Sequence, residues 1–434
     1  MKRVLHYLIL AAILLGVPAL CAWLGGYDEI WEGVKSFPPR TEDWGFHTEK
    51  LWNYRRPFRW GAFIGLMAFT AWCLWPFVKR AWRVAVKAAR SDTDIGDAAD
   101  TGAGSASTGN GALGDRALPT ANHQLSTHNR FPWWGWLGIA VLAVGWILSW
   151  NYRFQWFPPL PARIQVQISY APLWAGFILL MNALCVKRSG HSPMTDHPWA
   201  YAATFPASSL FWWFFEYLNR YVWNWYYLGI ENLGAAEYTL YATICFASVL
   251  PAVCAVAAWL HTFRIFDDRV YCGMARVNLR KPGWCLFLGV LATIGLTGIV
   301  FFPDYAYPFL WISPLMVFLL VQFLLKEPSV LDPCAQGNWS VFIRFAAAAL
   351  ICGFCWETWN YCALAKWVYA VPWVHRFQIW EMPLIGFGGY LPFGVECAAV
   401  TAWILPALVE PPEPNKIQQP NNLAIKQSNN HEHV

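Results

Sequence analysis

Charged residues are scarce in this sequence. Asp, Glu, Lys and Arg together make up 13% of its 434 residues, whereas a soluble globular domain carries about 25%. Hydrophobic residues make up 57%, and long apolar runs recur along the whole chain. The composition therefore excludes an ordinary soluble protein and predicts a polytopic membrane protein. The net charge of +5 is small and its cations stand beside the apolar runs, which indicates no nucleic-acid partner.

Several chemical motifs are also missing. The 12 cysteines are scattered through apolar segments without paired loop positions, which argues against the disulfide framework of a secreted domain. The sequence contains no glycine-rich phosphate loop, Gly-x-Ser-x-Gly elbow or HExxH motif. Histidines do not pair at four-residue spacing in facing apolar runs, so neither haem nor a metal is expected. We therefore predict no cofactor.

The apolar runs predict an all-α transmembrane bundle of about ten spans, each long enough to cross about 30 Å of hydrocarbon. The expected spans are residues 4–24, 60–78, 132–150, 168–186, 199–223, 239–261, 284–302, 308–325, 341–362 and 383–408. Lysines and arginines gather before the first span and after the second, fourth and sixth. This bias predicts that both termini are cytoplasmic, although Arg55, Arg56 and Arg59 would then face outward.

Two polar regions interrupt the apolar pattern. Residues 91–130 are rich in Gly, Ala, Ser, Thr and Asp, and residues 410–434 are polar as well. Neither region has enough apolar surface to bury on folding. We therefore predict an N-terminal two-span region, a disordered cytoplasmic linker, two membrane repeats and a disordered tail, at residues 1–90, 91–130, 131–264, 265–409 and 410–434.

The last eight expected spans contain two similar halves. A Glu-x-x-Asn motif at Glu216 and Asn219 corresponds to one at Glu357 and Asn360, and the distance from an earlier Pro-Leu pair to the Glu is 44 residues in one half and 43 in the other. Ordered matches at such spacing indicate internal duplication. Because each half has an even number of spans, both enter the membrane from the same face, which predicts two parallel four-span repeats.

The two motifs are the candidate catalytic groups. A Glu inside a span costs about 3 kcal/mol unless it is neutral, paired or hydrated, and residues three apart share one helix face. We predict a polar pocket between the repeats in which Glu216 and Glu357 act as acid/base groups and Asn219 and Asn360 position them. In the alternative, structural interpretation, these side chains cross-link helices and a neighbouring arginine or lysine neutralises each carboxylate.

Aromatic residues crowd both motifs, and a Trp-x-Tyr follows each of them. These rings predict a slot for a polyene, a quinone or a lipid tail; the alternative is that most of them form interfacial belts. The expected substrate-binding residues are Trp212, Trp225, Tyr227, Trp356, Trp367, Tyr369 and the mid-span Glu396. Cys352 and Cys355 form a C-x-x-C before the second motif; the first half lacks a counterpart, which favours packed thiols over a redox pair.

The segments FWWFFEYLNRYVWNWYYLGI and CWETWNYCALAKWVYAVPWVHRFQIWEMPLIGFGGYLPFGVEC resemble a family of uncharacterised bacterial polytopic membrane proteins, with EMPLIGF and LPFGVE as the most specific parts. This resemblance covers the fourth to tenth spans and implies the bacterial inner membrane. A fainter similarity is to membrane lycopene cyclases and carotenoid hydratases, which carry acidic residues in aromatic-rich spans and protonate a polyene. It implies that Glu216 and Glu357 protonate a substrate.

The expected function is a membrane-embedded enzyme that acts on a lipid or isoprenoid by carboxylate acid/base chemistry. The expected partners are the lipid bilayer and a lipid, isoprenoid or quinone ligand. One alternative is a proton-coupled transporter of a small or lipidic substrate, which predicts a water path toward both faces. The other is a non-catalytic membrane scaffold, which predicts that both carboxylates are bound by Arg, Lys or backbone groups.

Overall fold

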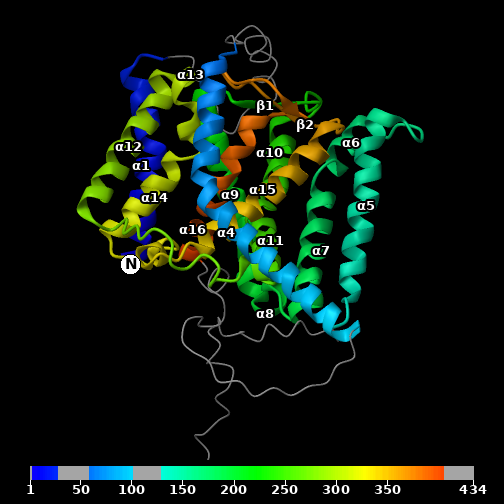
Figure 1. Ribbon diagram of the computed structural model, residues 1–434. Coiled ribbons are helices and arrows are strands. Elements are labelled where there is room, and N and C mark those ends of the chain that lie inside the picture. The colour runs from blue at the N-terminus through cyan, green and yellow to red at the C-terminus, as the bar shows by residue number, and fades with distance from the viewer. Residues whose placement is uncertain (1, 28–57, 101–128, 405–434) are drawn as a thin grey trace, which may run out of the picture.

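A computed structural model describes residues 2–27, 58–100 and 129–404, and over these ranges the chain forms a bundle of long helices (Figure 1). The elements in chain order are α1 (Lys2–Leu24), α4 (Trp60–Asp100), α5 (Trp133–Phe154), α6 (Ala162–Ile168), α7 (Ala171–Ser189), α8 (Pro193–Asp196), α9 (Pro198–Val222), β1 (Trp225–Leu228), α10 (Ala235–Phe246), α11 (Val249–His261), η1 (Arg264–Phe266), α12 (Pro282–Phe301), α13 (Pro303–Ala306), η2 (Tyr307–Leu310), α14 (Ser313–Leu324), η3 (Asp332–Gln336), α15 (Ser340–Tyr361), β2 (Lys366–Tyr369), β3 (Gln378–Ile379), β4 (Met382–Pro383), η4 (Leu384–Gly389) and α16 (Tyr390–Ile404).

Helices lie in all ten ranges that the sequence predicts as spans, of which the last, 383–408, is described only through residue 404. Within the described residues, seven helical segments are long and apolar enough to cross a membrane: Trp60–Val86, Trp133–Phe154, Ala162–Ser189, Ala235–His261, Pro282–Phe301, Ser340–Tyr361 and Leu384–Ala402. An eighth candidate is the segment Pro303–Leu310 together with α14, which meet at a bend of 51°. α1 contributes a shorter apolar stretch, and α9 is not among the seven. The chain therefore has the architecture of a membrane-embedded helical protein.

The outer surface of the bundle is rich in large apolar rings. Trp72 and Trp75 on α4 are 73% and 62% exposed, and Trp136 on α5 is 64% exposed. A soluble protein rarely leaves so many large apolar side chains uncovered, whereas hydrocarbon solvates them and Trp is favoured near membrane interfaces. These surfaces of α4 and α5 therefore suit contact with lipid.

Glycines allow α5 and α7 to pack closely against each other. A Cβ on Gly176 of α7 would lie 2.6 Å from the Leu142 backbone nitrogen of α5, and one on Gly138 of α5 would lie 2.9 Å from the Leu180 nitrogen of α7. Both values are too short for real contacts, so any side chain at these positions would separate the helices. Small residues are the usual means of close helix packing in membranes, where lipid competes for apolar contact.

The all-α expectation misses two short antiparallel ribbons. β1 pairs with β2, and β3 pairs with β4. α9 ends just before β1 at Trp223, which has a left-handed backbone (φ of +52°) and donates its N–H to the Asn219 carbonyl at 2.8 Å. A left-handed residue is a common way for a helix to end, and here it turns the chain into the β1 strand. The β1–β2 ribbon lies at the opposite end of the bundle from the N-terminus (Figure 1).

α4 lies across the front of the bundle in Figure 1. At its N-terminal end the Arg59 N–H donates to the Trp373 carbonyl at 2.8 Å. Further along, Phe77 stacks on Phe342 of α15 with ring centroids 5.9 Å apart, and the Arg80 guanidinium donates to the Cys272 carbonyl. The helix continues through Asp100, ten residues into the range predicted as a disordered linker. The rest of that linker, residues 101–128, and the predicted tail at 410–434 lie outside the described residues.

An ion network ties the loop after α11 to α15. Asp268 contacts Arg344 at 3.1 Å and His261 at 3.5 Å. Partial burial of Asp268 opposes ionisation, but the hydrogen bond from His261 and the charge of Arg344 outweigh it and lower the pKa of Asp268 to about 2. The carboxylate therefore stays ionised and neutralises a buried arginine at this end of the bundle.

Candidate functional site

Three ring groups hold the carboxyl of Glu216. Trp212, one turn earlier on α9, donates its Nε1–H to Oε1 at 3.0 Å. From β1, the Trp225 Nε1–H reaches the same oxygen at 3.0 Å and the Tyr227 O–H reaches it at 2.6 Å. The Glu216 side chain is buried, with 2% of the residue exposed. Indole and phenol groups thus satisfy this carboxyl oxygen in the interior of the protein.

The carboxyl of Glu357 has a similar environment. Its Oε1 accepts the Tyr369 O–H at 2.6 Å and the Trp367 Nε1–H at 3.4 Å, both from β2. The Tyr390 O–H, from the start of α16, reaches the same oxygen at 3.0 Å. Glu357 is fully buried, and among the described residues no group hydrogen-bonds its Oε2. One carboxyl oxygen is therefore bound by three donors while the other has none.

The two asparagines anchor the strands that carry these rings. Asn219 donates its Nδ2–H to the Trp225 carbonyl at 2.7 Å, and its Oδ1 accepts the Asn224 N–H at 2.8 Å. Asn360 donates to the Trp367 carbonyl at 2.7 Å and accepts the N–H of the same residue at 2.8 Å. Each asparagine thus fixes the start of the strand whose Trp and Tyr bind the neighbouring Glu. They bind the backbone, and no bond from either amide to a Glu carboxyl is found in the described part of the chain.

The β1–β2 ribbon places the two sets of rings next to each other. Trp225 is opposite Tyr369, and Tyr227 is opposite Trp367. Each pair joins a Trp that donates to one carboxyl with a Tyr that donates to the other. The two carboxyl sites are therefore connected through one short ribbon at one end of the bundle.

A cavity of about 520 Å³ lies beside the ribbon. Its wall includes residues of α4, α9, α10, α14, α15, α16 and both strands of the ribbon. All six ring donors to the two carboxyls line it: Trp212, Trp225, Tyr227, Trp367, Tyr369 and Tyr390. Neither Glu216 nor Glu357 is a lining residue, so the carboxyls lie behind an aromatic wall that they hold in place.

Six of the seven predicted substrate-binding residues line this one cavity, and the seventh, Glu396, does not. Glu396 is buried in the middle of α16, and no group in the described residues hydrogen-bonds its Oε2. Its neighbours Val395 and Ala399 pack in the cluster that contains Leu315 and Phe318 of α14. Glu396 is therefore buried in the packed interior and is not part of the cavity wall.

Two further carboxylates near the ribbon form ion pairs. Glu237 is bound by the Arg163 guanidinium through two hydrogen bonds of 2.7 Å. Glu381 contacts the Lys366 ammonium at 2.6 Å. Lys366 is at the start of β2, and its ion pair is with Glu381. The hydrogen bonds to the carboxyls of Glu216 and Glu357 come from aromatic side chains.

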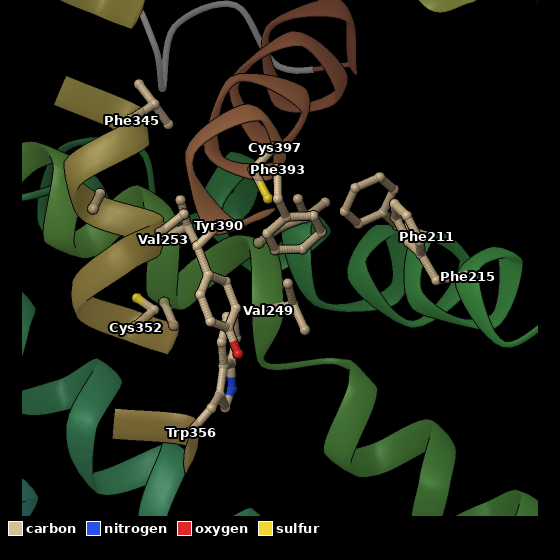
Figure 2. Close-up of a cluster of buried hydrophobic side chains, with 14 of the residues drawn as sticks. Phe211, Phe215, Val249, Val253, Phe345, Cys352, Trp356, Tyr390, Phe393 and Cys397 are labelled. Carbon is tan, nitrogen blue, oxygen red and sulfur yellow. The ribbon is translucent and has the colours of Figure 1, made fainter. Parts of the chain in front are cut away.

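Sequence reasoning did not identify Tyr390 or Asn224 as site residues. Tyr390 reaches Glu357 because its ring lies over Gly353 of α15, where it occupies the position that a Cβ would take. Its ring also stacks on Trp356 with centroids 5.9 Å apart (Figure 2). In the sequence, the feature that could have indicated this contact is Gly353 within the C-x-x-C segment, because a glycine in a helix can leave room for a neighbouring ring. The two cysteines of that segment are unpaired, with Cys352 buried in the core beside Tyr390.

Comparison with known proteins yields no relative. No protein-family model, curated protein or solved structure matches this chain. The functional argument therefore depends on the site itself.

Proposed function

We propose that this protein is a membrane-embedded enzyme that acts on a lipid or isoprenoid bound in the cavity. The observation that carries the proposal is that all six ring donors to two buried carboxyls line one cavity. A concave, mainly apolar site with a few convergent polar groups is the usual form of a small-molecule site. Ionisable residues within membrane spans also favour function over structure.

In this proposal the carboxyls exchange protons with the substrate through the tyrosines. The Tyr227 O–H points to Glu216, and the O–H groups of Tyr369 and Tyr390 point to Glu357. A substrate hydroxyl gives its proton to the phenol oxygen while the phenol proton moves to the carboxylate. The reverse transfer returns the proton to the substrate, so the tyrosine ends each transfer unchanged. Glu216 and Glu357 thus act as base and acid through a residue that touches the substrate.

The proposed architecture is ten spans with two parallel four-span repeats, in the bacterial inner membrane with both termini cytoplasmic. The matching bonds at Asn219 and Asn360 support the repeat, as does the symmetric register of Trp and Tyr across the ribbon. Arginines at positions 264, 269, 276 and 280 lie between α11 and α12, and this cluster supports the orientation by the positive-inside rule.

The proposal is tested with Glu216→Gln and Glu357→Gln. Glutamine keeps an acceptor oxygen for the ring donors, so the aromatic wall of the cavity stays in place. Its amide cannot take up a proton as a carboxylate does, so proton exchange with the substrate stops. We expect either variant to change the lipid extract of the cell by mass spectrometry, with one lipid or isoprenoid accumulating. The exposed Glu231→Gln is the matched control and leaves the extract unchanged.

Two further readouts separate chemistry from structure. If Glu357 exchanges protons, the conservative Glu357→Asp restores part of the lost conversion and Tyr369→Phe reduces it. An unchanged lipid profile in both Gln variants at normal protein level would rule out the enzyme. Proton uptake into vesicles that depends on Glu216 and Glu357 would favour the transporter instead. If Glu216→Gln and Glu357→Gln lower the amount of folded protein but change neither the lipid extract nor proton uptake, the result would favour the non-catalytic scaffold.

A further inference from the structure

The cavity wall contains no charged side chain. Among the described residues that line it, none is Lys, Arg, His, Asp or Glu, whereas tyrosine, tryptophan and aliphatic side chains are numerous. A phosphate, carboxylate or ammonium group placed there would lose its hydration without gaining a counter-charge, which is very costly. The wall therefore suits a ligand without charge.

Two buried polar atoms of the wall are unused. The Trp356 Nε1–H is a donor without a hydrogen-bond partner, and the Asn224 Oδ1 is an acceptor without one, among the residues that the structure describes. Trp356 is 4% exposed and Asn224 is 3% exposed, and both line the cavity. Unsatisfied polar atoms at such burial are uncommon and call for an explanation. A ligand that supplies both an acceptor and a donor would satisfy them.

Three tyrosines of the wall have no proton to donate to a ligand. Tyr227, Tyr369 and Tyr390 each commit the O–H proton to a carboxyl oxygen. Their phenol oxygens can therefore act toward a ligand only as acceptors, and the Tyr369 oxygen already accepts the Trp367 Nε1–H at 2.9 Å. A quinone or ester carbonyl has no proton to offer such acceptors. A hydroxyl group donates one bond and accepts others, and so matches the wall.

The cavity is long and has one polar end. On α15 its lining runs from Phe342 through Ala346 to Trp356, which is roughly 20 Å of helix at about 1.5 Å per residue. The polar rings gather at the β1–β2 end, and the stacked Phe77 and Phe342 lie at the other. On α4, Phe69 lines the cavity while remaining 61% exposed, so this wall borders the lipid phase.

We infer that the cavity binds a neutral single-chain lipid or isoprenoid alcohol, with its hydroxyl at the ribbon end beside Trp356 and Asn224 and its chain extended along α4 and α15. This inference rests on the proposed function and names its substrate class. It also assigns Trp356 and Asn224 as specificity-determining residues.

The test uses the purified full-length protein in lipid nanodiscs and matched photoactivatable probes. Three diazirine probes share a C15 isoprenoid chain and end in a hydroxyl, a methyl ether or a phosphate, and a fourth is a straight-chain alcohol of equal length. Crosslinked peptides are identified by mass spectrometry. We expect the hydroxyl probes to label β1, β2 or α15, the ether to label about fivefold less through the loss of one hydrogen bond, and the phosphate to label at background. Comparison of the two alcohols shows which chain type is preferred.

Two variants assign the polar contacts. Asn224→Leu removes the acceptor, so it lowers labelling by the alcohol to the level of the ether and leaves ether labelling unchanged. Trp356→Phe removes the donor, so it lowers labelling by both the alcohol and the ether. The matched control is Trp199→Phe at a position that is 88% exposed, and it changes neither. Ala346→Phe fills the cavity and abolishes labelling by every probe, whereas Ala→Phe at the exposed Ala202 does not.

Each outcome decides one of the two proposals. Equal labelling of the wild type by alcohol and ether overturns the hydroxyl assignment and leaves the lipid enzyme standing. Strong labelling by the phosphate probe overturns the neutral ligand. If Ala346→Phe labels as strongly as the wild type, the probes do not bind in the cavity. That result, or an absence of labelling by every probe, overturns the cavity as a lipid site and the proposed function with it. The comparison of probes on the wild type holds even if a variant fails to fold.

Discussion

Trp225 and Tyr369 face each other across the β1–β2 ribbon, and they donate to different buried carboxyls. The Trp225 indole binds Glu216 at 3.0 Å and the Tyr369 phenol binds Glu357 at 2.6 Å. Each ring is also part of the cavity wall. The ribbon therefore couples the two acidic centres to the surface that a ligand would touch.

The phenol groups should contribute measurably to stability. Tyr227→Phe or Tyr369→Phe removes the shortest donor to a buried carboxyl oxygen, and we expect each to lower the free energy of unfolding by about 1–3 kcal/mol. The measurement is unfolding of the purified protein by titration with SDS, followed by near-UV circular dichroism. Tyr305→Phe, at a tyrosine that is 68% exposed, is the control and should change stability by less than about 0.5 kcal/mol.

The asparagines should hold the ribbon in place. Asn360→Ala removes two hydrogen bonds to the Trp367 backbone, and Asn219→Ala removes the matching pair. Since these bonds are buried, we expect a loss of about 2–4 kcal/mol for either variant, together with a change in the near-UV signal from the Trp rings. Wild-type stability in both variants would mean that the strands are positioned by packing alone.

Gly353 should be intolerant of a side chain. The Tyr390 ring occupies the position of its missing Cβ, so Gly353→Ala pushes the ring away and breaks the Tyr390–Glu357 hydrogen bond. We expect a cost of about 1–3 kcal/mol from overpacking and a lower yield of folded protein by size-exclusion chromatography. Gly283→Ala on α12 is the control, because a Cβ there meets no neighbour within 4 Å. Equal yields would show that Tyr390 adjusts without cost.

The network at Asp268 predicts acid sensitivity at the loop end of the bundle. Because the pKa of Asp268 is lowered to about 2 in the folded protein, against about 3.9 when unfolded, its contribution is complete above roughly pH 4 and is lost as the pH falls toward 2. We expect about 1–2 kcal/mol from this group, because its side chain is 33% exposed and solvent screens it.

The check is an SDS titration of the wild type and Asp268→Asn between pH 2 and pH 7. Above pH 4 the variant should be the less stable protein, and the two curves should converge as the pH falls toward 2. Parallel curves over the whole range would show that Asp268 does not titrate with folding.

The sequence identified the chemical groups better than their arrangement. The pairing of Glu with Asn three residues later follows from helix geometry, and the Trp-x-Tyr pattern marks residues that share one face of a strand. These local relationships predict that Trp225, Tyr227, Trp367 and Tyr369 belong to one candidate site. Local spacing does not say which atoms bind, and the asparagines turned out to hold the backbone of the strands.

Contacts between distant segments could not be predicted in this way. Tyr390 meets Glu357 because α16 begins with this residue beside α15 and Gly353 leaves room for its ring. α4 lines the cavity although nothing in its sequence marks it as part of the site. Glu396 is a carboxylate within a predicted span, and the structure buries it without making it part of the cavity wall. Long-range packing determined each of these outcomes.

The pairing of β1 with β2 also limits how the molecule can move. Many transporters exchange their open faces by rocking one half against the other. Here β1, which follows α9, pairs with β2, which follows α15. Asn219 and Asn360 hydrogen-bond these strands to the two helices. The ribbon therefore joins the two helices at this end of the molecule. Separating them would break the hydrogen bonds between the strands and the bonds from the strand side chains to Glu216 and Glu357. We therefore expect a ligand to enter beside α4, where Phe69 lines the cavity and is exposed.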